Sequence, residues 1–201
     1  MSSYADALAY LDTHSNYDVT GRITSPTLDR MQALMAAMGD PQHAYPVIHV
    51  TGTNGKGSTT QMISRLLMAH GLTVGTYTSP HLERINERIN RNCESISDDD
   101  FAEQVAAVAD LEGLTAVRPS YFEAVTAAAY RWLADVAVDV AVVEVGLLGR
   151  WDATNVCNAQ VAVVTNIGID HTEYAGPTKH HIAVEKAGIV KPGSTLVLGE
   201  T

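Results

Sequence analysis

The strongest constraint on the fold is a series of short apolar runs that alternate with helical patterns from residue 47 onward. The apolar runs span residues 47–51, 72–77, 138–145, 161–167 and 196–198. The helical patterns between them run from about Ser58 to Ala69, Ser97 to Leu111, Tyr121 to Asp135 and Thr178 to Gly188. Strands that are apolar throughout and separated by helices are typical of a parallel sheet. The sequence therefore predicts an α/β fold, with a mostly parallel sheet and helices on both faces.

Two further helical patterns precede residue 47. In the second, Ser25 is suited to cap the helix and Pro26 to occupy its first turn. An apolar stripe follows at helical spacing, formed by Leu28, Met31, Leu34, Met35 and Met38. We interpret this methionine-rich stripe as core rather than as a cofactor site. The polar stretch 78–96 shows no period from which an element can be predicted.

Composition and charge exclude several classes of protein. With 201 residues, 46% of them hydrophobic, the chain is long enough to bury one substantial core. Its net charge of −10 would repel a nucleic acid, and its apolar runs fall short of the roughly 20 residues of a membrane helix. The amino terminus does not resemble a secretion signal, and Cys93 and Cys157 lack metal-ligand spacing. We expect a cytoplasmic protein with ordinary thiols and with no nucleic-acid or membrane partner.

The loop after the first apolar strand is rich in glycine and contains a lysine. It reads Thr-Gly-Thr-Asn-Gly-Lys-Gly-Ser over residues 51–58 and leads into a helix. Backbone N–H groups in such a loop can bind phosphate, while Lys56 would neutralise its charge and Ser58 would offer a hydroxyl to Mg²⁺. The strict P-loop pattern is not met, because Val50 occupies its first position and Gly57 separates Lys56 from Ser58. The order of strand, glycines, lysine and helix still favours a nucleotide site over a structural turn.

Two more loops follow strands and carry polar residues. Ser79 and His81, in the segment 78–82, could face bound phosphates or a metal, although this segment alone is also ordinary turn chemistry. Glu144 lies near the end of an apolar strand, where an uncompensated charge would be costly to bury. Mg²⁺ would compensate that charge. A structural salt bridge from Glu144 to Arg150 is the alternative.

The loop after the strand 161–167 brings Asp170, His171 and Glu173 close together in sequence. Because the carboxyl ends of parallel strands share one edge of a sheet, we interpret this group as a metal-binding candidate beside the phosphate loop. His180 and His181 are adjacent on the next helix and point to different sides, so they do not form a paired ligand set. From local chemistry alone, Lys186 at the end of that helix is a solvated charge.

Five motifs in order connect these loops to a known family. They are GTNGKGS at 52–58, TSPHL at 78–82, EVGLLGRWDATN at 144–155, TNIGIDHTEYAG at 165–176 and EKAGI at 185–189. Together they resemble the folylpolyglutamate synthase/dihydrofolate synthase family of the Mur ligase superfamily, from about residue 25 to the end. TSPHL, GRWDATN and EKAGI favour this folate branch over the ligases that build peptidoglycan.

The resemblance implies an ATP-dependent amide ligase. Such an enzyme adds L-glutamate to dihydropteroate or folate through an acyl phosphate, using ATP and one or two Mg²⁺ ions. The chain would be an incomplete N-terminal ATP-binding domain, with a P-loop NTPase-like sheet and without the C-terminal glutamate-binding domain. We expect a monomer whose partners are small molecules.

The resemblance also assigns roles to individual residues. The implied ATP-binding residues are Gly52, Thr53, Asn54, Gly55, Lys56, Gly57 and Ser58. The implied metal ligands are Ser58, Ser79, Glu144, His171 and Lys186, the last of them carbamylated, and the implied catalytic residues are Lys56, His171 and Lys186. The implied pterin or folate residues are Leu28, Ser120, Tyr121, Phe122, Glu123, Trp151, Asp152 and Ala153, with Phe122 stacking on the pterin. Arg84 and Arg88 would help the loop after TSPHL close over substrate.

The chain also departs from the family pattern at two positions. Leu148 stands where many relatives have a second glycine, and Trp151 replaces a frequent leucine, so the local turn and the pterin pocket differ. Three alternative functions stay open. One is a Mur-type ligase for another carboxylate and amino acid, the second is a P-loop ATPase or switch protein, and the third is an inactive fragment with an open sheet edge.

Overall fold

The computed structural model describes residues 3–16, 27–115 and 117–199. In this part of the chain, one seven-stranded sheet has the order β4-β3-β2-β5-β1-β6-β7. The strands are β1 (Val47–Thr51), β2 (Val74–Tyr77), β3 (Ile89–Arg91), β4 (Glu94–Ser95), β5 (Val140–Glu144), β6 (Val161–Val164) and β7 (Thr195–Leu198). Five of them pair in parallel, whereas β3 and β4 are antiparallel at one edge. The predicted mostly parallel α/β sheet is confirmed.

Helices connect the parallel strands and precede the first of them. The α-helices are α1 (Tyr4–Asp12), α3 (Asp29–Ala37), α4 (Lys56–Ala69), α5 (Asp98–Thr115), α6 (Tyr121–Asp135), α7 (Thr172–Ala175) and α8 (Lys179–Ala187). Short 3₁₀ helices are η1 (Pro41–His43), η2 (Ile85–Arg88) and η3 (Ala153–Val156). Side-chain caps explain where several helices begin. Ser120 accepts a hydrogen bond from the Glu123 N–H at the start of α6, and Thr178 caps α8 in the same way.

Most predicted elements are present, and the differences lie at their ends. The bounds of α6 are as predicted, whereas α4 begins at Lys56 rather than Ser58 and β2 begins at Val74 rather than Leu72. The stretch 78–96, for which no element was predicted, contains η2, β3 and β4, whose alternation is too short to detect. The predicted cap Ser25 and first-turn Pro26 lie outside the described residues. In the described part, Leu28 is the N-cap residue of α3.

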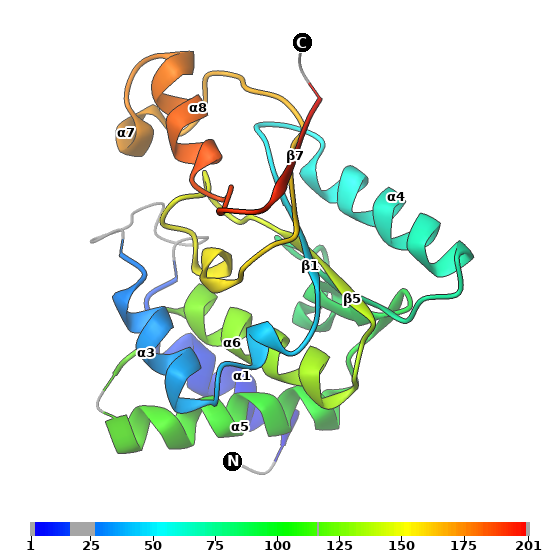
Figure 1. Ribbon diagram of the computed structural model, residues 1–201. Coiled ribbons are helices and arrows are strands. Elements are labelled where there is room, and N and C mark those ends of the chain that lie inside the picture. The colour runs from blue at the N-terminus through cyan, green and yellow to red at the C-terminus, as the bar shows by residue number, and fades with distance from the viewer. Residues whose placement is uncertain (1–2, 17–26, 116, 200–201) are drawn as a thin grey trace.

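Alternate residues of the strands pack against two different sets of helices. Ala141 and Val143 join a large core with α1, α3, α5 and α6, whereas Val140 and Val142 pack with the apolar side of α4. Figure 1 shows α4 on one side of the sheet, with α1, α3, α5 and α6 gathered together on the opposite side. The sheet is therefore covered on both faces, as its wholly apolar strands predicted.

The carboxyl ends of β1, β5 and β6 lie at one edge of the sheet. Because these three strands are parallel neighbours in the order β5-β1-β6, the loops that follow them are brought side by side. At the end of the sheet, β7 pairs with β6 and has exposed side chains throughout. No helix in the described ranges is long and apolar enough to cross a membrane.

Candidate active site

The glycine-rich loop connects β1 to α4, as expected for a phosphate-binding loop. Gly55 has a left-handed φ of 77° and is the N-cap residue of α4, which begins at Lys56. The Lys56 ammonium donates to the loop's own carbonyl oxygens, at 3.1 Å from Gly52 O and 3.4 Å from Thr53 O. An anion in the loop would compete with these carbonyls for the ammonium, because its charge makes the stronger hydrogen bond.

The loop after β6 is hydrogen-bonded to the backbone of the phosphate loop. Asn166 Oδ1 accepts hydrogen bonds from the backbone N–H groups of Thr53 and Asn54, at 3.1 and 2.9 Å. Thr165 Oγ1 donates to Asn54 O at 2.6 Å, and a Cβ on Gly52 would lie 1.8 Å from that same hydroxyl oxygen. Only glycine therefore fits at position 52. Asn166 and Thr165 were not among the predicted site residues, although a Thr-Asn pair directly after an apolar strand was a visible signal.

Glu144 is a buried carboxylate that faces the start of α4. Its side chain is 4% exposed, and its Oε2 accepts a weak hydrogen bond from the Ser79 N–H at 3.3 Å. A Cβ on Gly57 would lie 3.4 Å from the same oxygen. Burial raises the pKa of Glu144, while the Ser79 amide and the charge of Lys56 act in the opposite direction. The alternative of a Glu144–Arg150 salt bridge is wrong, because Arg150 pairs with Glu185 at 3.4 Å.

Lys186 is buried, which corrects its interpretation as a solvated charge. Its side chain is 2% exposed, on the side of α8 that also buries Ile182. Burial and, to a smaller extent, repulsion from Lys56 lower the pKa of Lys186, and Asp170 opposes the shift, so that the pKa is about 8. This burial could not be predicted from the local sequence, because a lysine in the last turn of a helix usually reaches solvent. The charges of Lys56, Asp170 and Lys186 thus influence one another at this edge of the sheet.

His171 lies at the start of α7, on the same edge. It has a left-handed φ of 48° and pairs with the carboxylates of Asp170 at 3.3 Å and Glu173 at 4.0 Å. His180 and His181 pack edge to face, with ring centroids 6.2 Å apart. Within the described ranges, no three or more His, Cys, Asp or Glu side chains converge as a ready metal cluster. The metal-ligand roles of Ser58, Ser79, Glu144, His171 and Lys186 stay predictions.

The predicted substrate residues lie on two elements beside this site. Ser120, Tyr121, Phe122 and Glu123 form the first turn of α6, where Arg30 of α3 donates two hydrogen bonds to the Glu123 carboxylate, each of 3.1 Å. Ser120 N also donates to Glu123, at 2.7 Å. Glu123 is therefore engaged by protein groups and fixes the turn that presents Phe122. Arg30 had no sequence signal, because it comes from a distant helix.

The Phe122 ring packs on the loop that follows β5. A Cβ on Gly146 would lie 2.6 Å from Phe122 Cζ, so the ring touches the loop backbone directly. The Tyr77 ring lies behind Phe122, with centroids 6.2 Å apart. Leu28, the N-cap residue of α3, is half-buried, and its predicted contact with substrate stays a prediction. The loop 146–155 thus forms one wall beside Phe122, and its first residue comes two positions after Glu144.

The loop 146–155 is held by its own buried polar groups. The Asp152 carboxylate accepts hydrogen bonds from Leu147 N at 2.7 Å and Thr154 N at 3.0 Å. Asn155 Nδ2 donates to Arg150 O at 2.9 Å and to Gly188 O at 3.1 Å, which joins the loop to the end of α8. Ala153 is buried, whereas Trp151 is 49% exposed. Asp152 is therefore occupied by the loop's own donors, and its predicted contact with substrate stays a prediction.

The two departures from the family pattern lie in this loop. Leu148 has a left-handed φ of 57°, a conformation that favours glycine, which explains why glycine suits this position in relatives. Thr51 Oγ1 donates to Leu148 O at 2.5 Å and holds this part of the loop to β1. The Trp151 side chain is about half exposed, and its predicted contact with the pterin stays a prediction.

Arg84 and Arg88 flank the turn that follows the TSPHL motif. Arg84 donates to both carboxylate oxygens of Asp98, at 2.7 and 2.9 Å, and lies over the Tyr4 ring. Arg88 is buried, donates to His81 Nδ1 at 2.9 Å and lies over the Tyr121 ring. In this structure both arginines are engaged with protein groups, so their predicted closure over substrate stays a prediction.

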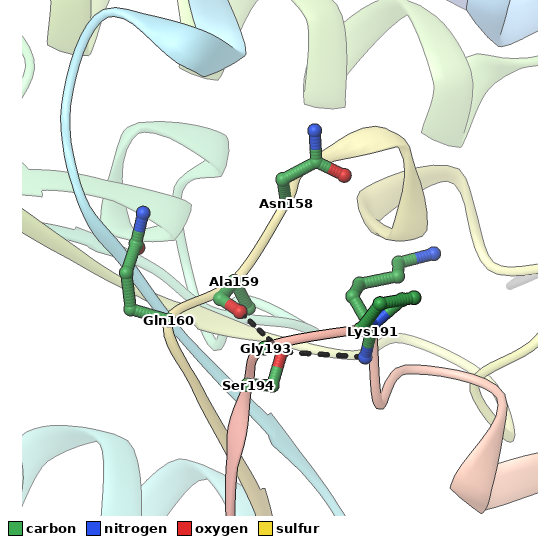
Figure 2. A pocket seen from close by; sticks show the side chains of 7 residues that line it. Asn158, Ala159, Gln160, Lys191, Gly193 and Ser194 are labelled. Carbon is green, nitrogen blue, oxygen red and sulfur yellow. Dashed lines mark hydrogen bonds between the residues drawn. The ribbon is translucent and has the colours of Figure 1, made fainter.

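A separate pocket of about 400 Å³ lies at the opposite edge of the sheet. It is lined by Asn158, Ala159, Gln160, Lys191, Pro192, Gly193 and Ser194, which precede β6 and β7 (Figure 2). The Ser194 hydroxyl is used within the wall itself, because it donates to Ala159 O and accepts from Lys191 N. None of the predicted site residues lines this pocket, so it is not the candidate active site.

Comparison with known families identifies the class of protein. Residues 50–198 match the family described as Mur ligase middle domain. This match covers the end of β1, the phosphate loop, β5, the loop 146–155, β6 and α8, and so includes most of the site described above. The chain belongs to the Mur ligase middle domain family.

The individual relatives are enzymes of the folate branch. The chain is 44% identical to a dihydrofolate synthase/folylpolyglutamate synthase of Mycobacterium tuberculosis, over 87% of this chain and 39% of the relative. It is 40% identical to the Bacillus subtilis enzyme of the same name, over 100% and 46%. The resemblance to this family is confirmed. The chain spans less than half the length of these relatives.

Solved structures show the same relationship. Escherichia coli FolC in complex with DHPP and ADP matches with a TM-score of 0.89 and 36% identity, covering 99% of this chain and 46% of that chain. Mycobacterium tuberculosis folylpolyglutamate synthase complexed with ADP and AMPPCP matches with a TM-score of 0.85 and 40% identity, covering 97% and 44%. At these identities and scores, the fold of the chain is that of the corresponding part of these enzymes.

Proposed function

We propose that this chain is the nucleotide- and pteroate-binding part of an ATP-dependent amide ligase that adds L-glutamate to dihydropteroate or folate. The observation that carries the proposal is the buried Glu144 carboxylate, which faces Gly57 and Ser79 where the phosphate loop enters α4. A buried carboxylate with one weak hydrogen bond would be stabilised in its charged form by a compensating cation. The names of the relatives and the nucleotide complexes of their structures support the same conclusion.

The donors at this edge of the sheet fit a magnesium nucleotide. Glu144 would supply the carboxylate, Ser58 and Ser79 hydroxyl oxygens, and the nucleotide its phosphate oxygens, which are the hard ligands that Mg²⁺ prefers. When bound, Mg²⁺ would neutralise phosphate charge during transfer. Lys56 would exchange its two carbonyl partners for phosphate oxygens, and the amino end of α4 would face the same anion.

The reaction needs positioning and charge rather than a protein nucleophile. A carboxylate oxygen of the pteroate attacks the γ-phosphorus of ATP, ADP leaves, and an acyl phosphate forms. The amino group of glutamate then attacks the acyl carbon, phosphate leaves and the amine loses a proton, which gives the amide. Lys56 and the backbone N–H groups of the loop would stabilise the transferred phosphoryl group.

Lys186 fits the proposed carbamylation. A lysine whose pKa is lowered to about 8 is partly neutral at physiological pH, and a neutral amine can add to carbon dioxide. The product is a carbamate, and one proton is released. The change would turn a buried cation near Lys56 into an anion, which would remove the repulsion between the two lysines and could serve as a ligand for a second metal ion.

Calorimetric titration tests the proposal. The 201-residue chain is titrated first with a non-hydrolysable ATP analogue and Mg²⁺, and then with dihydropteroate. We expect both to bind, and Phe122→Leu, which keeps an apolar side chain against Gly146, to weaken pteroate binding roughly fivefold to tenfold while the nucleotide binds as before.

Each other outcome selects an alternative. Nucleotide binding without pteroate binding would favour a Mur-type ligase for another carboxylate. Hydrolysis of ATP without any carboxylate, with Lys186 unmodified by mass spectrometry in bicarbonate, would favour an ATPase. If neither ligand binds, the proposed site is not competent in this chain.

A further inference from the structure

A line of buried polar groups joins β1 to the loop 146–155. His49, in the middle of β1, is 0% exposed, and its Nε2 lies 2.8 Å from Thr154 Oγ1. Thr154, also 0% exposed, makes a short hydrogen bond through the same hydroxyl to Asp152 Oδ1. Burying polar groups costs free energy unless each of them is hydrogen-bonded, so the hydrogen bonds along this line must be well defined.

The hydrogen-bond directions along the line follow from counting protons. Burial raises the pKa of the Asp152 carboxyl, but it accepts hydrogen bonds from backbone N–H groups, among them those of Leu147 and Thr154, and these donors act in the opposite direction. Its Oδ1 is also the acceptor of the Thr154 hydroxyl. The single hydroxyl proton of Thr154 is therefore donated to Asp152. Thr154 Oγ1 must then accept from His49, so His49 carries its proton on Nε2.

A second contact agrees with this tautomer. The other ring nitrogen, His49 Nδ1, lies 3.9 Å from the Sγ of the buried Cys157, whose thiol can donate to an unprotonated nitrogen. Burial, with a smaller effect of Lys191, lowers the pKa of His49 to about 3, which keeps the ring neutral. His49 thus has one protonation state and one tautomer in the folded chain.

The line ends at the wall of the substrate pocket. Asp152 Oδ2 holds the backbone N–H of Leu147 at 2.7 Å, and the preceding residue, Gly146, is where the Phe122 ring packs. Any rotation of the Asp152 carboxylate would release the backbone at this point. The orientation of the carboxylate is in turn set by Thr154 and, through it, by His49.

We propose that His49 and Thr154 are positioning residues for the pteroate pocket, which hold the Asp152 carboxylate in one orientation so that Leu147, Gly146 and Phe122 keep a shape that fits the substrate. This inference rests on the proposed function, because the pocket is taken to bind a pteroate. Neither residue needs to touch the substrate. Their effect is on pocket shape, and so on pteroate binding rather than on nucleotide binding.

Paired threonine variants test this role by calorimetry. Thr154→Val keeps the shape but removes the hydroxyl, which leaves the His49 N–H without its acceptor and Asp152 without one donor. We expect pteroate affinity to fall roughly tenfold while the affinity for the ATP analogue with Mg²⁺ is unchanged. Thr154→Ser, which restores the hydroxyl, should return pteroate affinity to within about threefold of the original.

Thr76→Val is the matched control. Thr76 is a buried threonine of β2 whose hydroxyl lies 2.9 Å from Ser64 Oγ of α4, on the other face of the sheet. Its loss should lower thermal stability without changing pteroate affinity. If Thr154→Val also lowers stability but leaves pteroate affinity unchanged, Thr154 is only structural and the proposal is overturned.

Nitrogen NMR of the His49 ring tests the line without any substrate. We expect a neutral ring with its proton on Nε2 at pH 7, and loss of this single tautomer in Thr154→Val. A proton on Nδ1 would overturn the proposal even if pteroate binds. If the original chain binds nucleotide but no pteroate, the proposed function and the positioning role fail together, and the NMR result shows which part of the hydrogen-bond line survives.

Discussion

Two neighbouring loops at the same edge of the sheet are built in opposite ways. In the phosphate loop 52–58, the lysine donates only to backbone carbonyl oxygens, which a phosphate could replace. The loop backbone is held by hydrogen bonds to Asn166 and Thr165, which lie outside the loop. The loop 146–155 satisfies its polar groups internally, through Asp152 and Asn155, and is anchored to β1. A loop that binds an anion needs donors that can be released, whereas a loop that shapes a pocket needs every donor occupied.

The largest expected effect is on the internally satisfied loop. Asp152→Ala removes the acceptor of Leu147 N, Thr154 N and the Thr154 hydroxyl at once. Leaving buried donors unpaired should lower the free energy of unfolding by roughly 4 kcal/mol, measured by urea denaturation. A loss below about 1 kcal/mol would show that the loop does not depend on this carboxylate.

The buried His49 should make the same loop sensitive to acid. Because the pKa of His49 is lowered from 6.5 to about 3 in the folded chain, folding excludes a proton that the unfolded chain binds. This contribution to stability is complete above pH 6.5 and is lost as the pH falls towards 3. Lowering the pH from 6.5 to 4 should therefore reduce the free energy of unfolding by roughly 3 kcal/mol.

His49→Gln measures this contribution, because glutamine keeps a side-chain donor near Nε2 but does not titrate. The unfolding free energies of the variant and the original chain are compared at a series of pH values. As the pH falls, the free energy of unfolding of the original chain should decrease more than that of the variant. Parallel curves over this range would mean that His49 is not buried in its neutral form.

The phosphate loop should respond in binding rather than in stability. Lys56→Met removes the charge that would neutralise phosphate, and the side chain donates only to loop carbonyl oxygens in this structure. We expect the affinity for an ATP analogue with Mg²⁺ to fall roughly a hundredfold by calorimetry, with the melting temperature little changed. A large fall in melting temperature would show that Lys56 holds the loop together instead.

Asn166→Ala should have a smaller effect on the same loop. It removes the acceptor for the N–H groups of Thr53 and Asn54, both of which can turn to solvent because the loop is partly exposed. The nucleotide affinity should fall about fivefold, since a looser loop loses more entropy on binding. Asn166→Asp keeps the acceptor, and a similar loss in that variant would point to charge rather than loop order.

The smallest effect is expected for Arg150, in the loop 146–155. Its side chain is 43% exposed and its pair with Glu185 spans 3.4 Å, so the ion pair is screened by water. Arg150→Met should change the free energy of unfolding by less than about 0.5 kcal/mol. The backbone of Arg150, which bonds to Glu185 O and Asn155, is unaffected by this change. A larger loss would mean that the side chain also anchors the loop.

The sequence predicted the central part of the fold well because apolar strands and capped helices are local signals. The apolar run that contains Val140 and Val142 of β5 and the helical pattern from Tyr121 to Asp135 are readable from neighbouring residues alone. The edge strands β3 and β4 were missed because three and two residues carry no measurable period. Lys186 was misread from local chemistry, since its burial depends on packing by segments distant in sequence.

The parts of the site that lie within one continuous loop could be predicted from the sequence, whereas the parts that join distant segments could not. The phosphate loop and Glu144 stand in continuous motifs directly after strands. Arg30 and His49 were missed because their roles come from partners on other elements, Glu123 and Thr154. A pattern in one segment cannot show which distant side chain accepts its hydrogen bond.

One feature of β1 connects both loops. His49 and Thr51 are two residues apart and so point to the same face of the strand, where they hold Thr154 and Leu148 of the loop 146–155. The phosphate loop continues directly from the end of that strand. The two proposed ligands would therefore bind to loops that are both attached to this one short strand. Any cooperativity transmitted through it must be reciprocal, so the factor by which nucleotide tightens substrate binding equals the factor by which substrate tightens nucleotide binding.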